Sequence, residues 1–230
     1  MAYQIDTEFT GTIENLIFYK RNGKFLIRTI PVQAMASQIT AKAFGKASSK
    51  AKTLRTLLSP LIPFPKDRNM QYRLTTAIQA FLAVLKTGAE LQPENNKLSG
   101  FRFIQTSDFN NCLKIPISIS MLPGGNISFT VPEMNPLDSI TAPAGTSRVE
   151  LQIMAVTFQA NHNQSYAGIP ETHLILYTNT IQQAWNFVIE TKARPGSIIV
   201  IAAALRYWKE DMEIKKEGFM PVEILRAFYN

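Results

Sequence analysis

Apolar and polar residues alternate over residues 11–31, in the segment GTIENLIFYKRNGKFLIRTIP. A period of two residues is typical of β-strands, because successive side chains point to opposite faces of a sheet. The pair Asn22-Gly23 separates two alternating runs, and both residue types accept positive φ angles at little cost. The segment therefore predicts a β-hairpin with a two-residue type I′ turn, ending at Pro31 because proline cannot donate to a strand ladder.

Over residues 32–58 the spacing of the apolar positions becomes that of a helix. One apolar stripe repeats at intervals of three and four residues and comprises Phe44, Ala47, Ala51, Leu54 and Leu58. The prolines of the segment SPLIPFPKD end this helix, and a second helix is predicted over residues 70–86 with Gly88 as its C-cap. We expect the two helices to pack antiparallel as a helical hairpin.

The polar segment 91–100, LQPENNKLSG, predicts a boundary between a domain over residues 1–92 and a domain over residues 101–230. Beyond it, strand-like segments are separated by turn signals, and they cover residues 113–120, 126–131, 148–159, 173–177, 184–190, 197–207 and 221–228. The run SIIVIAAAL lacks alternation, which indicates a central strand covered on both faces. The predicted fold is therefore α+β: a β-hairpin and helical hairpin, then an antiparallel β-sandwich of immunoglobulin or fibronectin-III type.

The formal charge of +7 is unevenly distributed along the 230 residues. Residues 1–73 hold 12 Lys and Arg against 4 Asp and Glu, whereas residues 74–230 hold 12 against 13. A basic segment indicates an acidic protein surface or a nucleic acid as partner, although a solvated surface explains it equally well. The candidate basic contact residues are Lys20, Arg21, Lys24, Arg28, Lys42, Lys46 and Lys50.

The predicted hairpin is also rich in large apolar residues. An isolated hairpin is marginal in water, so its apolar side chains must pack on its own helices or on a neighbouring subunit. The candidate interface residues are Ile13, Leu16, Phe18, Tyr19, Phe25 and Ile27.

No catalytic or metal-binding pattern is evident. His162 and His173 lie in a polar loop and at a strand start, without the further ligands that a metal site requires. Cys112 has neither histidine near it in sequence, and as the only cysteine it excludes an internal disulfide. The glycines do not form a phosphate-binding pattern. We therefore expect no enzymatic activity and no cofactor.

The sequence also bears on location. The longest apolar run, residues 198–205, is too short to span a bilayer. The N-terminal sequence MAYQIDTEFTG lacks the basic and apolar regions of a secretory signal. We expect a cytoplasmic protein, or one exported by a route without a classical signal peptide.

The hairpin and the basic helix after it resemble a bacterial family of unknown function. The family pattern is G-x-I-G-N-x-x-x-Y-x-R-x-G-K-x-x-x-R, followed by a helix that ends near L-x-P-L and by a sandwich-like C-terminal half. The matching residues are Gly11, Ile13, Asn15, Tyr19, Arg21, Gly23, Lys24 and Arg28. Glu14 departs from it, since the family prefers glycine there. The resemblance implies this architecture and brings no catalytic residues.

These observations favour a non-enzymatic structural protein that self-associates through its N-terminal hairpin into a homo-oligomer, as a ring, tube or filament. The alternative is a nucleic-acid-binding accessory protein that uses the basic first third of the chain. An enzyme would require His162, Cys112 or acidic side chains to converge in one pocket.

Overall fold

The computed structural model describes residues 2–3, 10–30, 35–62, 67, 69–91, 95–160, 162 and 164–230. The chain divides into two compact units, Met1–Lys42 and Ala43–Asn230. Helix α1 (Met35–Leu57) begins in the first unit and ends in the second. The boundary expected between residues 92 and 101 falls inside the second unit, where it remains a prediction.

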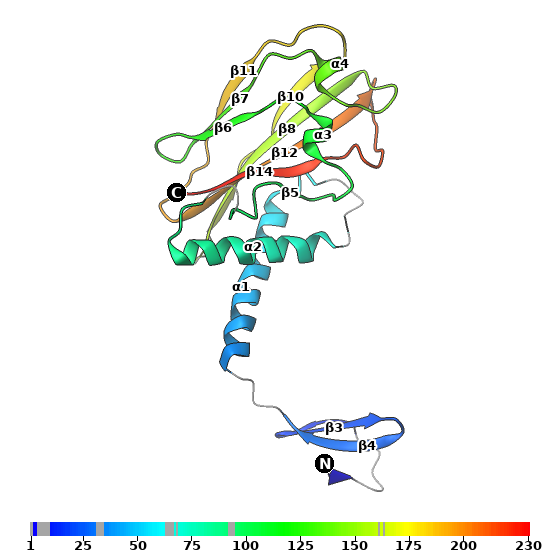
Figure 1. The fold of residues 1–230 in the computed structure, drawn as a ribbon, viewed down its shortest axis with the longest axis vertical. Helices are drawn as coiled ribbons and strands as arrows, with labels where there is room; N and C mark the ends of the chain where they lie inside the picture. The colour runs from blue at the N-terminus through cyan, green and yellow to red at the C-terminus, as the bar shows by residue number, and fades with distance from the viewer. Residues whose placement is uncertain are drawn as a thin grey trace. The chain divides into compact units, whose positions relative to one another are not determined.

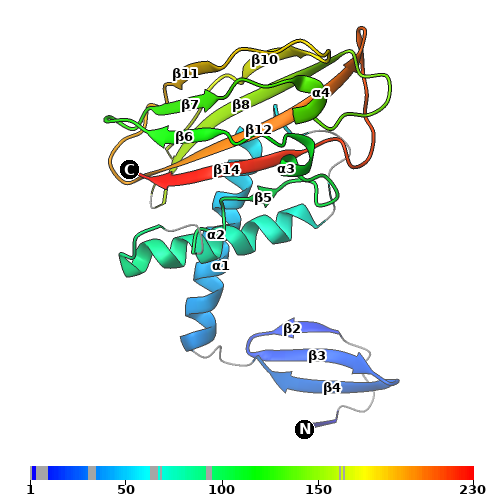
Figure 2. The same ribbon diagram turned by 45° about the horizontal axis from the view of Figure 1, so that its top comes forward.

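The first unit contains a small antiparallel sheet with the strand order β1-β4-β3-β2. Its strands are β1 (Ala2–Tyr3), β2 (Gly11–Ile13), β3 (Leu16–Arg21) and β4 (Lys24–Thr29), of which the last three are labelled in Figure 2. Strands β3 and β4 form the predicted hairpin. Asn22 and Gly23 have φ angles of 51° and 76°, and positive φ at both residues is what a type I′ turn requires.

The second unit contains two antiparallel sheets (Figure 1). The larger has the order β10-β8-β12-β14-β5, with β9 paired to β8 and β13 paired to β12. Its strands are β5 (Phe101–Arg102), β8 (Arg148–Gln159), β9 (Ser165–Ala167), β10 (Glu171–Leu176), β12 (Ser197–Lys209), β13 (Met212–Glu213) and β14 (Val222–Tyr229). The smaller sheet has the order β11-β7-β6, formed by β6 (Ser118–Met121), β7 (Ile127–Val131) and β11 (Trp185–Ile189).

Both faces of the larger sheet are covered. One face shares a core with α1 and with α2 (Met70–Thr87), and the other shares a core with the smaller sheet. Along β12, Ile198 and Val200 belong to the first core, whereas Ile199 and Ile201 belong to the second, and all four are 0% exposed. The prediction of a central strand covered on both sides is confirmed.

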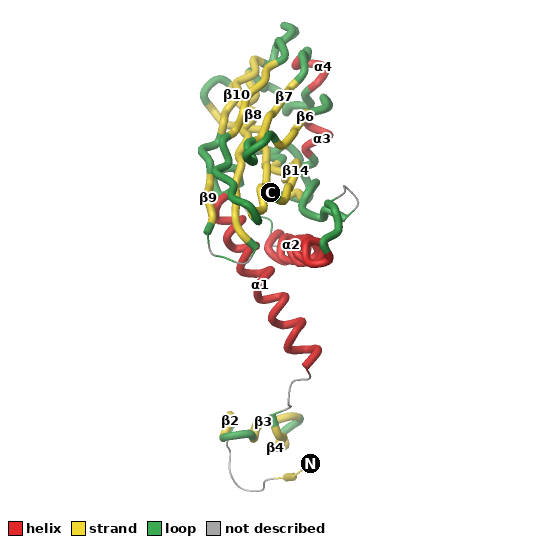
Figure 3. The backbone as a smooth tube through the Cα atoms, turned by 90° about the vertical axis from the view of Figure 1, so that its left-hand side faces the viewer, coloured by secondary structure: helices red, strands yellow, loops and turns green. Residues whose placement is uncertain are grey.

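The predicted fold class is thus confirmed as α+β with sandwich-like antiparallel sheets. The helical layer on the second face of the larger sheet adds to a simple two-layer sandwich (Figures 1 and 2). The helices form the predicted pair, but they cross each other rather than lie side by side along their lengths (Figures 1 and 3). Gly88 has the left-handed φ of 69° and caps α2 as predicted.

The apolar stripe of α1 is only partly buried. Most of the predicted stripe is buried in the core that the larger sheet shares with α1 and α2, namely Ala47, Ala51, Leu54 and Leu58. Phe44 is 50% exposed, contrary to the expectation, because the packing of α1 onto the core begins at Ala47.

Several short elements have no clear sequence signal. The helices α3 (Phe109–Cys112) and α4 (Pro136–Ser139) have four residues each, and β5 and β13 have two. The strand expected over residues 113–120 begins only at Ser118, after Pro116, which lacks a backbone donor. Among the described helices, none is long and apolar enough to cross a membrane.

Candidate functional site

Strand register sorts the side chains of the N-terminal sheet onto two faces. Phe18 pairs with Ile27, and Ile13 pairs with Leu16. Directly opposite residues of antiparallel strands point to the same side of a sheet, as do residues two apart in one strand. Five of the six predicted interface residues therefore share one face, which we call the apolar face: Ile13, Leu16, Phe18, Phe25 and Ile27.

The described residues 10–30 of this sheet do not form a buried core. Residues 16–19 and 25–27 are half-buried, and no residue between 10 and 30 is fully buried. Ile13 is 51% exposed and Ile30 is 43% exposed. The second unit, by contrast, has extensive cores on both faces of its larger sheet. Among residues 10–30, the apolar face is thus a group of five apolar side chains that the sheet leaves exposed or half-buried.

The opposite face carries the cations. Arg21 pairs with Lys24, and the guanidinium of Arg28 lies 5.5 Å from the ring centroid of Tyr19. We call this the basic face; it is formed by Tyr19, Arg21, Lys24 and Arg28 together with the half-buried Ile17 and Leu26. Tyr19 therefore lies with the cations and not with the other predicted interface residues.

Lys20 is the one predicted basic residue of the hairpin on the apolar face. It pairs with Phe25, and its Nζ lies 4.8 Å from the centroid of that ring. The pair adjoins the Asn22-Gly23 turn, so Lys20 occupies the end of the apolar face and leaves its middle free of charge.

The lysines on α1 differ in exposure. Lys42 is exposed and Lys46 is half-buried, whereas Lys50 is only 7% exposed. The Nζ of Lys50 donates a hydrogen bond to the backbone carbonyl of His162 at 2.6 Å. Burial lowers the pKa of Lys50, and the positive charge of Lys46 lowers it further. Lys50 thus links α1 to the backbone of His162, and its side chain is largely buried.

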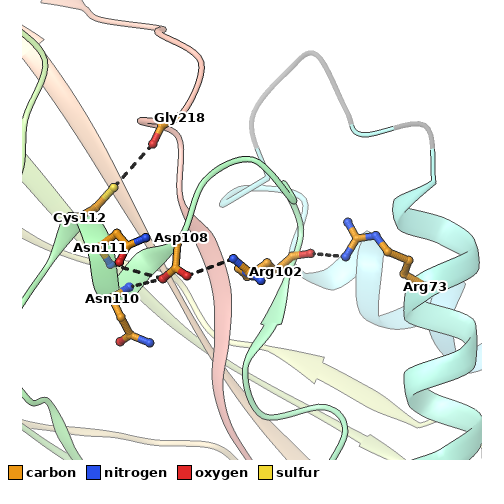
Figure 4. A network of polar contacts seen from close by, with 7 residues as sticks. All are labelled: Arg73, Arg102, Asp108, Asn110, Asn111, Cys112 and Gly218. Atoms are coloured by element: carbon orange, nitrogen blue, oxygen red, sulfur yellow. Dashed lines mark hydrogen bonds and ion pairs between the residues drawn. The ribbon is translucent and has the colours of Figure 1, made fainter.

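The structure gives the two histidines and the cysteine different surroundings. His162 is exposed, and His173 stacks on Trp185 with 3.8 Å between ring centroids, where burial lowers the pKa of His173. The buried thiol of Cys112 donates to the carbonyl of Gly218 at 3.7 Å (Figure 4), and burial raises its pKa. Within the described part of the chain, no group of three or more His, Cys, Asp or Glu residues is arranged to hold a metal ion.

A chain of polar contacts connects α2, β5 and α3 (Figure 4). Arg73 on α2 donates to the carbonyl of Arg102 at 2.9 Å, and Arg102 forms an ion pair with Asp108 at 3.0 Å. The other oxygen of Asp108 accepts the backbone N–H groups of Asn110 and Asn111 and so caps α3. These contacts attach the short elements β5 and α3 to helix α2 within the second unit, which is a structural role.

No protein-family model, curated protein or solved structure matches this chain. The resemblance of residues 11–28 to a bacterial family therefore stays a prediction. Glu14, which departs from the family pattern, has a φ angle of 51°, a left-handed conformation that favours glycine.

Glu223 on β14 is a buried carboxyl group that the sequence did not single out. It is 7% exposed, and its burial raises its pKa, as does the negative charge of Asp108. With Phe109 and Arg226 it lines a cavity of about 300 Å³. The neighbours Val222 and Ile224 are also buried, so alternation along the strand does not distinguish Glu223 from them.

Replacement of Glu223 by Gln is expected to stabilise the protein at pH 7 by on the order of 1 kcal/mol. A carboxyl whose folded pKa is raised stabilises the fold below its unfolded value of 4.5, and this contribution is lost as pH rises through the folded pKa. The neutral amide avoids that loss. The free energy of unfolding, measured in urea at pH 4 and pH 7, should rise for the variant only at pH 7. The exposed control Glu217→Gln should show no rise, and an equal rise in both variants would contradict the assignment.

A second group of basic residues lies in the second unit. Lys192 and Arg194 follow β11 and line a cavity beside β9, and Lys52 on α1 lines an adjoining cavity. Residues 74–230 are close to neutral overall, so no excess of charge marks Lys192 and Arg194 in the sequence. Only the chain's folding brings them near the basic part of α1.

Proposed function

We propose that this chain is a structural protein that self-associates through the apolar face of its N-terminal sheet. The observation that supports this most directly is the collection of five large apolar side chains on one face of a sheet in which none of residues 10–30 is fully buried. Full burial of one such side chain is worth roughly 1.5–3 kcal/mol. Even partial burial of the whole face favours association by several kcal/mol.

Separation of charge from the apolar face favours a second copy of the chain as the partner. Arg21, Lys24 and Arg28 lie on the opposite face, so a copy can pack on the apolar face without facing these cations. Lys20 lies at one end of the face, where its ammonium group can stay in water while its stem covers apolar surface. Among residues 10–30, the middle of the apolar face therefore brings no charged group that must be desolvated into such a contact.

Two geometries follow from this surface. If the apolar faces of two copies pack on each other, the contact is two-fold and closes as a dimer. If the apolar face packs on a different surface of the next copy, the contact is head-to-tail and gives a ring, tube or filament. The second geometry is the one that the structural-protein hypothesis requires for an extended assembly.

Light scattering of the full chain and of a chain that begins at Val32 tests the proposal. The full chain should have a mass that is a multiple of 25.8 kDa, and the shortened chain should be monomeric. The shortening leaves the second unit, Ala43–Asn230, intact. Electron microscopy of the full chain would distinguish dimers from ordered polymers. A monomeric full chain would overturn the proposal and favour nucleic-acid binding, for which the basic face is the candidate surface.

A further inference from the structure

Two adjoining cavities flank β9 in the second unit, and we call them together the basic cleft. One has a volume of about 420 Å³ and lies between β8, β9 and the segment 192–197. The other has a volume of about 400 Å³ and lies between α1 and β9, which Figure 3 shows near each other. The cavities share Phe158, Gln164 and Ser165 as lining residues, so they form neighbouring parts of one depression.

The lining of the basic cleft is cationic and rich in hydrogen-bond donors. Lys192 and Arg194 line the first cavity, and Lys50 and Lys52 line the second. None of the described residues that line either cavity is Asp or Glu. The remaining polar lining consists of hydroxyl and amide side chains, namely Ser49, Thr53, Thr56, Thr157, Gln159, Gln164, Ser165, Tyr166 and Ser197. Like charges without neutralising carboxylates favour an anion in the depression.

The backbone that presents Lys192 is held firmly. The preceding residue, Thr191, is 0% exposed, and its hydroxyl donates to the carbonyl of Gly125 at 2.7 Å. The carbonyl of Thr191 accepts a hydrogen bond from the hydroxyl of Thr157. Lys192 itself has a φ angle of 50°, a left-handed conformation that is uncommon for residues other than glycine. Its Nζ lies 4.7 Å from the centroid of the Tyr166 ring. The site is therefore preorganised on this side.

Few of the cationic donors are used within the protein. One guanidinium nitrogen of Arg194 donates to the side chain of Gln164 at 3.2 Å, which leaves the other guanidinium N–H groups for a ligand. Lys52 and Lys192 are both exposed side chains with three donors each. Lys50 already donates to the carbonyl of His162, and it adds positive charge to the lining of the second cavity.

We propose that the basic cleft binds a ligand with at least two linked phosphate groups, either free pyrophosphate or the phosphate chain of a nucleotide. Lys192 and Arg194 line one cavity and Lys52 lines the other, so linked phosphates offer separate anionic groups to the two sets of cations, whereas inorganic phosphate offers only one. Arginine binds phosphate oxygens through two parallel N–H groups, and lysine binds them as a point charge. The cleft lies wholly within Ala43–Asn230, so this inference is independent of self-association.

Titration calorimetry of the full chain with sodium pyrophosphate, ATP and inorganic phosphate tests the proposal. Pyrophosphate or ATP should bind at least tenfold more tightly than inorganic phosphate, and higher salt should weaken the binding. Equal affinities for pyrophosphate and ATP identify the phosphates as the whole ligand, and tighter binding of ATP identifies a nucleotide.

Variants make the test specific. Lys192→Gln and Arg194→Gln should each weaken pyrophosphate or ATP binding about tenfold. Lys114→Gln removes the same charge from an exposed position that lines neither cavity, and it should change the affinity less than about twofold. Absence of binding, or an equal loss in all three variants, would overturn the proposal. Binding of a single-stranded oligonucleotide without binding of pyrophosphate or ATP would also overturn it.

Discussion

Exchange of both Phe18 and Ile27 for aspartate is expected to dissociate the assembled protein into monomers. The two residues pair directly across β3 and β4 at the middle of the apolar face. Each large apolar side chain lost from a contact removes roughly 1.5–3 kcal/mol, and every 1.4 kcal/mol is about a tenfold change in affinity. The double variant should therefore associate at least about a hundredfold more weakly, and the two carboxylates add a desolvation cost. Sedimentation or light scattering over a range of concentrations measures this loss.

The basic face offers a matched control. Tyr19 and Leu26 also pair directly across β3 and β4, but they point to the opposite side of the sheet. Their exchange for aspartate adds the same two charges and removes one aromatic and one aliphatic side chain from the same strands. This control should keep the mass of the full chain. Dissociation of both double variants to the same extent would contradict the assignment of the contact to the apolar face.

Replacement of Phe129 by Ala is expected to lower the free energy of unfolding of the second unit by about 3–5 kcal/mol. Phe129 is 0% exposed in the core between the two sheets, and its ring stacks on Phe187 with 5.1 Å between centroids. Its loss removes apolar contacts from both sheets and leaves a cavity that the surrounding strands cannot fill. Urea unfolding followed by tryptophan fluorescence measures the change, since Trp185 and Trp208 both lie in the second unit.

Phe44→Ala is the matched comparison, because the same side chain is removed from a position that is 50% exposed. We expect this variant to change the free energy of unfolding by no more than about 0.5 kcal/mol. A loss at Phe44 as large as that at Phe129 would contradict the packing of α1 described above.

Much of the fold is predictable from local patterns. Alternation and the Asn22-Gly23 turn predict the hairpin, and an uninterrupted apolar run predicts the central position of β12. Gly88 marks the end of α2. These features depend on residues close together in the chain, because turn geometry and strand alternation are set by neighbouring φ and ψ angles. The division of the hairpin into an apolar and a basic face is also implicit in the sequence, since a two-residue turn sets the register of the strands it joins.

The roles of individual charged residues depend on the tertiary structure. Lys50 belongs to a regular basic pattern on α1, yet it is buried, and its hydrogen-bond partner His162 lies 112 residues away in the chain. Glu223 is buried by elements that precede it by about half the chain, and Lys192 and Arg194 gain a common cleft with α1 only after the sheet forms. By itself the sequence determined the hairpin, the two long helices and the buried central strand. Which side chains are buried or brought together was decided by contacts between distant segments, because burial and electrostatic surroundings depend on everything that packs around a group.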